Sequence, residues 1–138
     1  MSYKRKNSGF TLVELVVVIT IMMVVTAIGV VSFSGINKKS RDSRRMSDLD
    51  KLAIALEIYK QENGIYPTKS AENMPSSLVS DYIEALPTDP KSGYSYYYHR
   101  PSEYIYELYA YMEDAGSRTG SYSYSCGTYS CNYQISNP

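Results

Sequence analysis

A single carboxylate, Glu14, lies at the start of a long apolar segment, where an acidic side chain is costly. The 22 residues from Leu15 to Ile36 carry no charged side chain. A carboxylate inside a membrane helix costs roughly 2.5 to 3.5 kcal/mol even on permissive insertion scales, so Glu14 should have a cationic partner or a specific role. Cleavage between Gly9 and Phe10 would supply a partner, because it creates an α-amino group about one helical turn before the carboxylate.

The residues on both sides of Glu14 favour a processed membrane segment. A basic leader, Lys4-Arg5-Lys6, precedes the apolar run. That run can cross a bilayer, because a helix rises 1.5 Å per residue and needs about 20 residues for the crossing. An ordinary secretory signal has a shorter apolar region of roughly 7 to 15 residues. A plain single-span anchor explains the length of the run, but it explains neither Glu14 nor the Gly9-Phe10 pair.

The motif Gly-Phe-Thr-Leu-Val-Glu at residues 9–14 follows a short basic leader and precedes a long apolar helix. It resembles the N-terminus of type IV prepilins and of type II secretion pseudopilins, over about residues 5–35. The resemblance implies that a prepilin peptidase cleaves after Gly9 and methylates the new amine of Phe10. It also implies that Glu14 pairs with the Phe10 amine, of a neighbouring subunit, while a homo-oligomeric helical filament assembles on an inner-membrane platform.

We expect four segments along the chain. Residues 1–9 form the leader peptide, 10–36 a hydrophobic transmembrane and assembly helix, 37–63 an amphipathic continuation of that helix, and 64–138 a globular domain. The continuation is predicted from one apolar stripe at three-to-four-residue spacing, which contains Met46, Leu49, Leu52, Ala53, Leu56 and Tyr59. Asn63-Gly64 followed by Pro67 ends the pattern. Ile54 and Ile58 fall on the opposite side, either as part of a wide stripe or as a second face for neighbouring helices.

The globular segment predicts loops followed by a small antiparallel sheet. Prolines punctuate residues 64–90, with one short helix expected at about 76–85. Two tyrosine-rich strands at 94–98 and 104–111 are expected to form a hairpin around a turn at 99–102. A third strand is expected within 129–135. The order agrees with the pilin fold, so we expect an α+β, pilin-like protein with a long N-terminal helix packed on a small antiparallel sheet.

Charge and cysteines bear on which side of the membrane the domain lies. The chain has zero formal net charge, but residues 52–138 carry five basic and ten acidic side chains, which argues against a general nucleic-acid-binding surface. The lysines and arginines at 38–45 would by count place that side in the cytoplasm. Cys126 and Cys131 outweigh this count, because a disulfide between them indicates an oxidising exterior, and the resemblance keeps the leader inside.

No catalytic constellation is recognisable, and we expect neither an enzyme nor a cofactor. His99 is expected as a polar turn residue, and there is no glycine-rich phosphate loop and no zinc-ligand spacing. Residues 63–67 and 86–90 resemble the major, G-type pseudopilins, which carry an acidic calcium-binding loop near the C-terminus. Here only Glu113-Asp114 occupies that region, which is too few oxygen ligands to predict a calcium site from the sequence, so no metal ligand is assigned.

We therefore interpret the chain as a structural pilin subunit, made in the cytoplasmic membrane as a single-pass precursor and then placed in an extracellular filament. One alternative is a pseudopilin of a type II secretion system. Another is a minor pilin at a filament tip that binds DNA or a surface, and a third is an anchored protein that never polymerises. The 16 tyrosines fit a small sheet and subunit packing, or else a surface on which sugars or bases stack.

Overall fold

One helix dominates the secondary structure. The computed structural model describes residues 9–69 and 74–137, and within its helix it describes the side chains of all residues except 29–34. Helix α1 spans Leu12–Asn63, which is 52 residues or about 80 Å. The chain divides into two units, Met1–Ile36 and Asn37–Pro138, so α1 contributes to both. Among the described residues, no helix combines the length and apolar character that a membrane crossing requires.

Helix α1 ends where the sequence predicted. Gly64 adopts a left-handed backbone with φ of 82°, and its N–H donates to the carbonyl of Lys60 at 2.8 Å. This is the usual C-terminal geometry of a helix, and glycine adopts it without steric cost. Pro67 follows three residues later and cannot continue the helix.

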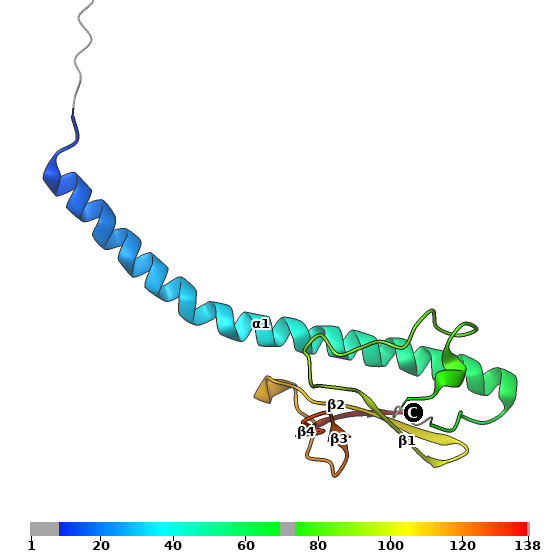
Figure 1. Ribbon diagram of the computed structural model, residues 1–138. Coiled ribbons are helices and arrows are strands. Elements are labelled where there is room, and N and C mark those ends of the chain that lie inside the picture. Colours follow the sequence, from blue (N-terminus) through cyan, green and yellow to red (C-terminus); the bar gives the residue numbers. More distant parts are fainter. Residues whose placement is uncertain (1–8, 70–73, 138) are drawn as a thin grey trace, which may run out of the picture. The chain divides into compact units, whose positions relative to one another are not determined.

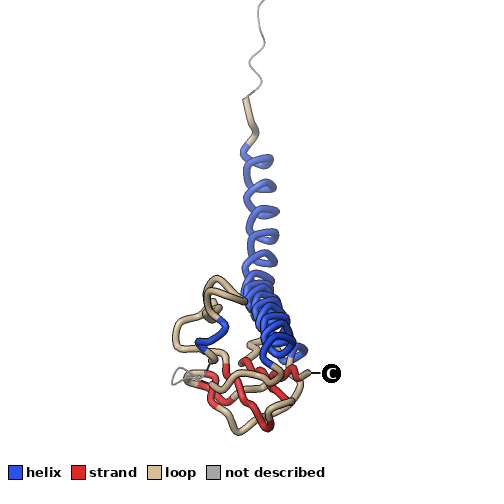
Figure 2. The backbone as a smooth tube through the Cα atoms, turned by 90° about the vertical axis from the view of Figure 1, so that its right-hand side faces the viewer, coloured by secondary structure: helices blue, strands red, loops and turns tan. Residues whose placement is uncertain are grey.

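A three-stranded antiparallel sheet in the order β1-β2-β5 packs on the second half of α1 (Figures 1 and 2). Its strands are β1 (Tyr97–Ser102), β2 (Ile105–Ala110) and β5 (Tyr133–Ser136). A separate two-stranded hairpin consists of β3 (Ser125–Cys126) and β4 (Tyr129–Ser130). The α+β, pilin-like fold predicted from the sequence is confirmed.

The core lies between α1 and the sheet. Leu49, Leu52 and Leu56 of the helix are fully buried, against Tyr98 and Leu108 from the sheet. Burying each leucine side chain contributes about 1.5 to 3 kcal/mol. Met46, Ala53 and Tyr59, predicted on the same stripe, are partly buried against this core, whereas Ile54 and Ile58 are exposed.

Two local predictions are wrong. The segment 76–85 forms only a single 3-10 turn, η1 (Ser76–Leu78), because the chain then becomes extended at Val79 and Ser80 takes a positive φ of 82°. The predicted turn at 99–102 is instead part of β1, which pairs with β2 up to Ser102 and Ile105. His99 therefore lies in a strand opposite Glu107, and the reversal falls at residues 103 and 104.

Candidate assembly site

Glu14 helps to cap the N-terminus of α1. Its carboxylate oxygen Oε2 accepts hydrogen bonds from the backbone N–H of Thr11 at 2.9 Å and from the Thr11 hydroxyl at 2.8 Å. In return the N–H of Glu14 donates to the Thr11 hydroxyl oxygen at 3.2 Å. This reciprocal arrangement is a capping box, in which two residues three positions apart satisfy backbone groups that the first helical turn leaves free. Glu14 thus has a local structural role in the isolated subunit.

Gly9 and Phe10 lie just before the helix, in a non-helical and exposed segment. The Phe10 side chain is 85% exposed. A peptide bond in an exposed, irregular segment is accessible to a protease. Residues 1–8 of the predicted leader lie outside the described residues. Cleavage, methylation and the pairing of Glu14 with the Phe10 amine remain predictions.

The first half of α1 presents apolar side chains on all sides. Each apolar side chain described between Leu12 and Ile28 is exposed, and Met22, Met23 and Ile28 are each 67% or 68% exposed. Soluble monomers rarely expose apolar patches of more than a few hundred Å². This surface therefore requires lipid or other protein chains around it.

Two threonine hydroxyls within this apolar half already have hydrogen-bond partners. The Thr20 hydroxyl donates to the carbonyl of Val17 at 2.8 Å, and the Thr26 hydroxyl donates to the carbonyl of Met22 at 2.7 Å. Threonine side chains that bond their own helix backbone can be surrounded by apolar material without loss of a hydrogen bond. The segment is chemically suited to a water-free environment.

The second unit contains an ionic cluster that sequence reasoning did not find. Arg45, fully buried, donates from Nε and Nη2 to the two carboxylate oxygens of Asp89 at 2.7 and 2.8 Å. Its Nη1 donates to Asp42 at 2.7 Å and to Glu113 at 3.1 Å. The sequence showed only a charged stretch at 38–45, and nothing local indicates that Arg45 is buried.

Glu113 is the second centre of this cluster. Arg41 binds both of its carboxylate oxygens, at 2.6 and 2.8 Å, and Lys91 donates to Oε2 at 3.1 Å. The hydrogen bonds from Arg41, followed by those from Lys91 and Arg45 and opposed by burial, lower the pKa of the Glu113 carboxyl to about 2. The carboxylate is charged under all ordinary conditions.

The acidic residues near 113 do not fit a calcium site. Asp42 accepts from the backbone N–H groups of Glu113 and Asp114 at 3.0 and 2.8 Å, and Asp114 accepts from the N–H of Gly116 at 3.1 Å. Calcium requires six to eight oxygen ligands. Over residues 9–69 and 74–137, no group of three or more His, Cys, Asp or Glu side chains is arranged to hold a metal ion.

The outer face of the sheet carries a second, smaller cluster around the disulfide that joins Cys126 to Cys131. Tyr97 stacks on Tyr124 with ring centroids 4.8 Å apart, and Tyr109 is buried between neighbouring rings. Many tyrosine faces are thus occupied by other rings. His99 contacts Glu107 and the Tyr124 hydroxyl through Nδ1, at 2.9 and 3.0 Å.

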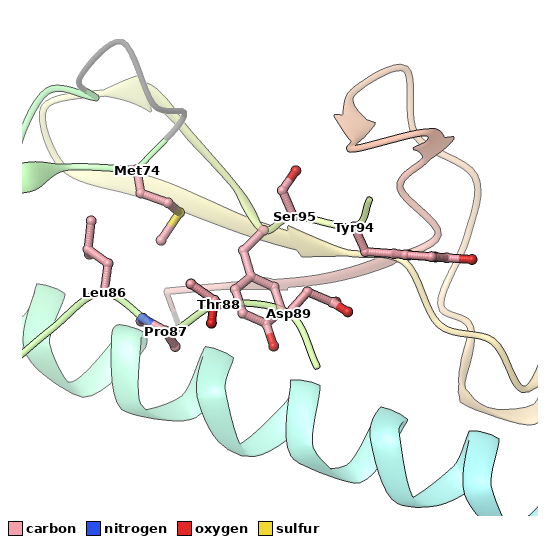
Figure 3. Close-up of a pocket in the computed structure, with 8 residues that line it drawn as sticks. Met74, Leu86, Pro87, Thr88, Asp89, Tyr94 and Ser95 are labelled. Atoms are coloured by element: carbon pink, nitrogen blue, oxygen red, sulfur yellow. The ribbon is translucent and has the colours of Figure 1, made fainter. Parts of the chain in front are cut away.

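A small pocket lies between the loops and the sheet in the second unit (Figure 3). Its volume is about 190 Å³, and its lining includes Met74, Leu86, Asp89 and Tyr94. Ligand pockets usually measure roughly 300 to 1,000 Å³. The pocket is smaller than this range, and Asp89 is already bound by Arg45, so the pocket does not indicate a substrate site.

Comparisons with known proteins agree with the N-terminal motif. The prokaryotic N-terminal methylation motif matches residues 4–30. The type II secretion system core protein G of Vibrio cholerae is 30% identical over 136 residues, which cover 88% of this chain and 92% of that protein. The protein of the same description from Escherichia coli K12 is 34% identical over 116 residues, covering 75% and 79% of the two chains. No solved structure matches significantly.

Proposed function

The chain belongs to the family of type IV pilins and type II secretion pseudopilins, and on this premise we propose that it is a structural pseudopilin subunit. These relatives are type II secretion core proteins, and their similarity covers 88% of this chain in one case and 75% in the other, so they favour the secretion alternative over a surface pilus. The precursor would be anchored in the membrane by the first half of α1. After processing, the subunit would polymerise through the same segment.

The exposed apolar surface of residues 12–28 is the observation that carries this proposal. A filament of such subunits removes that surface from water by packing many copies of the helix side by side. Each Å² of apolar surface that leaves water contributes about 25 cal/mol. Lipid serves the same purpose before assembly, so one segment suits both the precursor and the filament.

Glu14 has a proposed role in selecting the register of assembly. Once cleavage after Gly9 frees the Phe10 amine, a neighbouring Glu14 can pair with it inside the apolar bundle. An unpaired charge in such surroundings is costly, so subunits in the wrong axial register along the filament are disfavoured. The prepilin peptidase and an inner-membrane platform are the partners that this route requires.

The proposal is tested by replacing the chromosomal copy with Gly9→Ala. We expect the unprocessed precursor to accumulate in the membrane and the secreted proteins to be lost from the medium. N-terminal sequencing of the wild-type protein should begin at Phe10. A mature protein that begins at Met1 would contradict the processing step. If the Gly9→Ala strain loses surface filaments while its secretion stays normal, the chain is a pilin instead of a pseudopilin.

A further inference from the structure

The loop between β2 and β3 is held to α1 by side chains of the second unit. Asp42 on α1 accepts the N–H groups of Glu113 and Asp114, directly after β2 and Met112. The buried amide of Asn132 holds the neighbouring position, because its Oδ1 accepts the Met112 N–H at 2.6 Å and its Nδ2 donates to the Met112 carbonyl at 2.9 Å. The loop therefore leaves the sheet with its backbone already bound.

We propose that the Arg45 guanidinium does in this chain what the resemblance to G-type pseudopilins assigns to calcium: it holds the acidic loop after β2 in place. Arg45 joins three segments that are distant in sequence: the helix at Asp42, the proline-rich loop at Asp89, and the loop after β2 at Glu113. A calcium ion would likewise hold a loop by collecting six to eight of its oxygen atoms.

The hydrogen bonds of the three buried carboxylates show why no metal ion is needed. Both oxygens of Asp89 and both oxygens of Glu113 accept from guanidinium groups. In Asp42, Oδ1 accepts from Arg45 and from a backbone N–H, and Oδ2 accepts from a second N–H. Each of the six oxygens therefore already has a donor. Calcium could bind them only after these donors were displaced.

The charges in the cluster also balance. Three cations, Arg41, Arg45 and Lys91, face three carboxylates, Asp42, Asp89 and Glu113. The Arg45 side chain is 0% exposed, and those of Asp42 and Asp89 are each 1% exposed. Arg41 and Lys91 reach Glu113 from partly exposed positions. A divalent ion would add two charges to a site that these groups already leave neutral, and it would strand the buried Arg45 guanidinium away from water at high cost.

The first experiment needs no variant. Hydrogen exchange of the peptide that covers residues 111–119 is followed by mass spectrometry, on full-length protein in detergent, with millimolar calcium or with excess EGTA. We expect the same exchange rates and the same melting temperature in the two buffers. Slower exchange of this peptide in calcium, or a lower melting temperature in EGTA, would overturn the proposal. Neither measurement depends on filament assembly.

The second experiment compares two adjacent arginines. Arg44 is a matched control, because its side chain is 66% exposed and its Nε lies 4.0 Å from Asp48. We expect Arg45→Gln to accelerate exchange at 111–119 by about tenfold or more, since a buried ion network is broken, while Arg44→Gln leaves it unchanged. If Arg45→Gln does not fold, Arg41→Gln removes only the partly exposed partner of Glu113. Unchanged exchange in the folded Arg45 or Arg41 variant would contradict the proposal.

Discussion

The two halves of α1 have the same backbone conformation and opposite side-chain environments. Between Leu12 and Ile28 the described side chains are mostly apolar and all exposed, whereas Asp42 and Arg45, both charged, are buried. Burial in this helix therefore depends on what the rest of the chain places against each half. The second half has a sheet and its loops around it, while the first half needs partners that the chain itself does not supply.

This contrast predicts that substitutions in the first half act on assembly and that those in the second half act on folding. The largest effect is expected from Glu14→Gln. Glutamine at this position preserves a capping box, so the helix terminus remains satisfied, but it cannot pair as an anion with the Phe10 amine. An unpaired amine in an apolar bundle costs about 3 to 5 kcal/mol per subunit, so filaments should be lost.

The measurement is the amount of secreted protein in the medium, with cleavage and membrane level of the subunit checked by immunoblot. Glu84→Gln is the control, because Glu84 is exposed on the second unit. Melting of the second unit should be the same in both variants. Normal secretion with Glu14→Gln would mean that the carboxylate serves only the capping box, and the proposed pairing would be wrong.

A core substitution in the second half should reverse this outcome. Leu52→Ala removes a fully buried side chain and is expected to lower the free energy of unfolding by about 2 to 5 kcal/mol. Ile54→Ala, two residues away, removes a side chain that is 61% exposed and should change it by less than about 0.5 kcal/mol. Chemical denaturation followed by circular dichroism gives both values. Equal losses would show that the outer face of α1 is also packed.

The ionic cluster predicts how stability depends on pH. The pKa of Glu113 is lowered from its ordinary value of 4.5 to about 2, so its contribution is complete above about pH 4.5 and is lost as the pH falls through 2. The loss amounts to about 3 kcal/mol, at 1.36 kcal/mol per pKa unit. Unfolding at a series of acidic pH values should show this decline. Glu113→Gln should start from lower stability at neutral pH and decline less, and parallel profiles for the two proteins would contradict the assignment.

The smallest effect is expected at the disulfide. The loop between Cys126 and Cys131 is short, so replacing both cysteines by serine should cost about 2 kcal/mol. The change should be confined to the tyrosine cluster on the outer face of the sheet and should leave α1 intact. Intact-mass measurement before and after reduction should find both thiols blocked in freshly isolated protein, and free thiols would contradict an oxidised tail.

Local signals in the sequence were enough for the helix and its C-terminal end. The apolar stripe through Leu52 and Gly64 at the helix end act through neighbours within a few residues, whereas the capping box of Thr11 and Glu14 was recognised only in the structure. The order of helix, loops and sheet follows from the same kind of pattern. For this reason the amino-acid sequence by itself determines the fold class and indicates the residues proposed for assembly.

Only the tertiary structure revealed the ionic cluster and the true limits of the strands. The hydrogen bonds of Arg45 to Asp89 span 44 residues, and those of Arg41 to Glu113 span 72. His99 joins β1 because Glu107 lies opposite it, although its local sequence is typical of a turn. A charged residue is usually exposed, and only the packing of distant segments around it can offset the cost of its burial. Contacts of this range leave no periodic trace in the sequence, so Arg45 could not be distinguished there from the exposed Arg44 beside it.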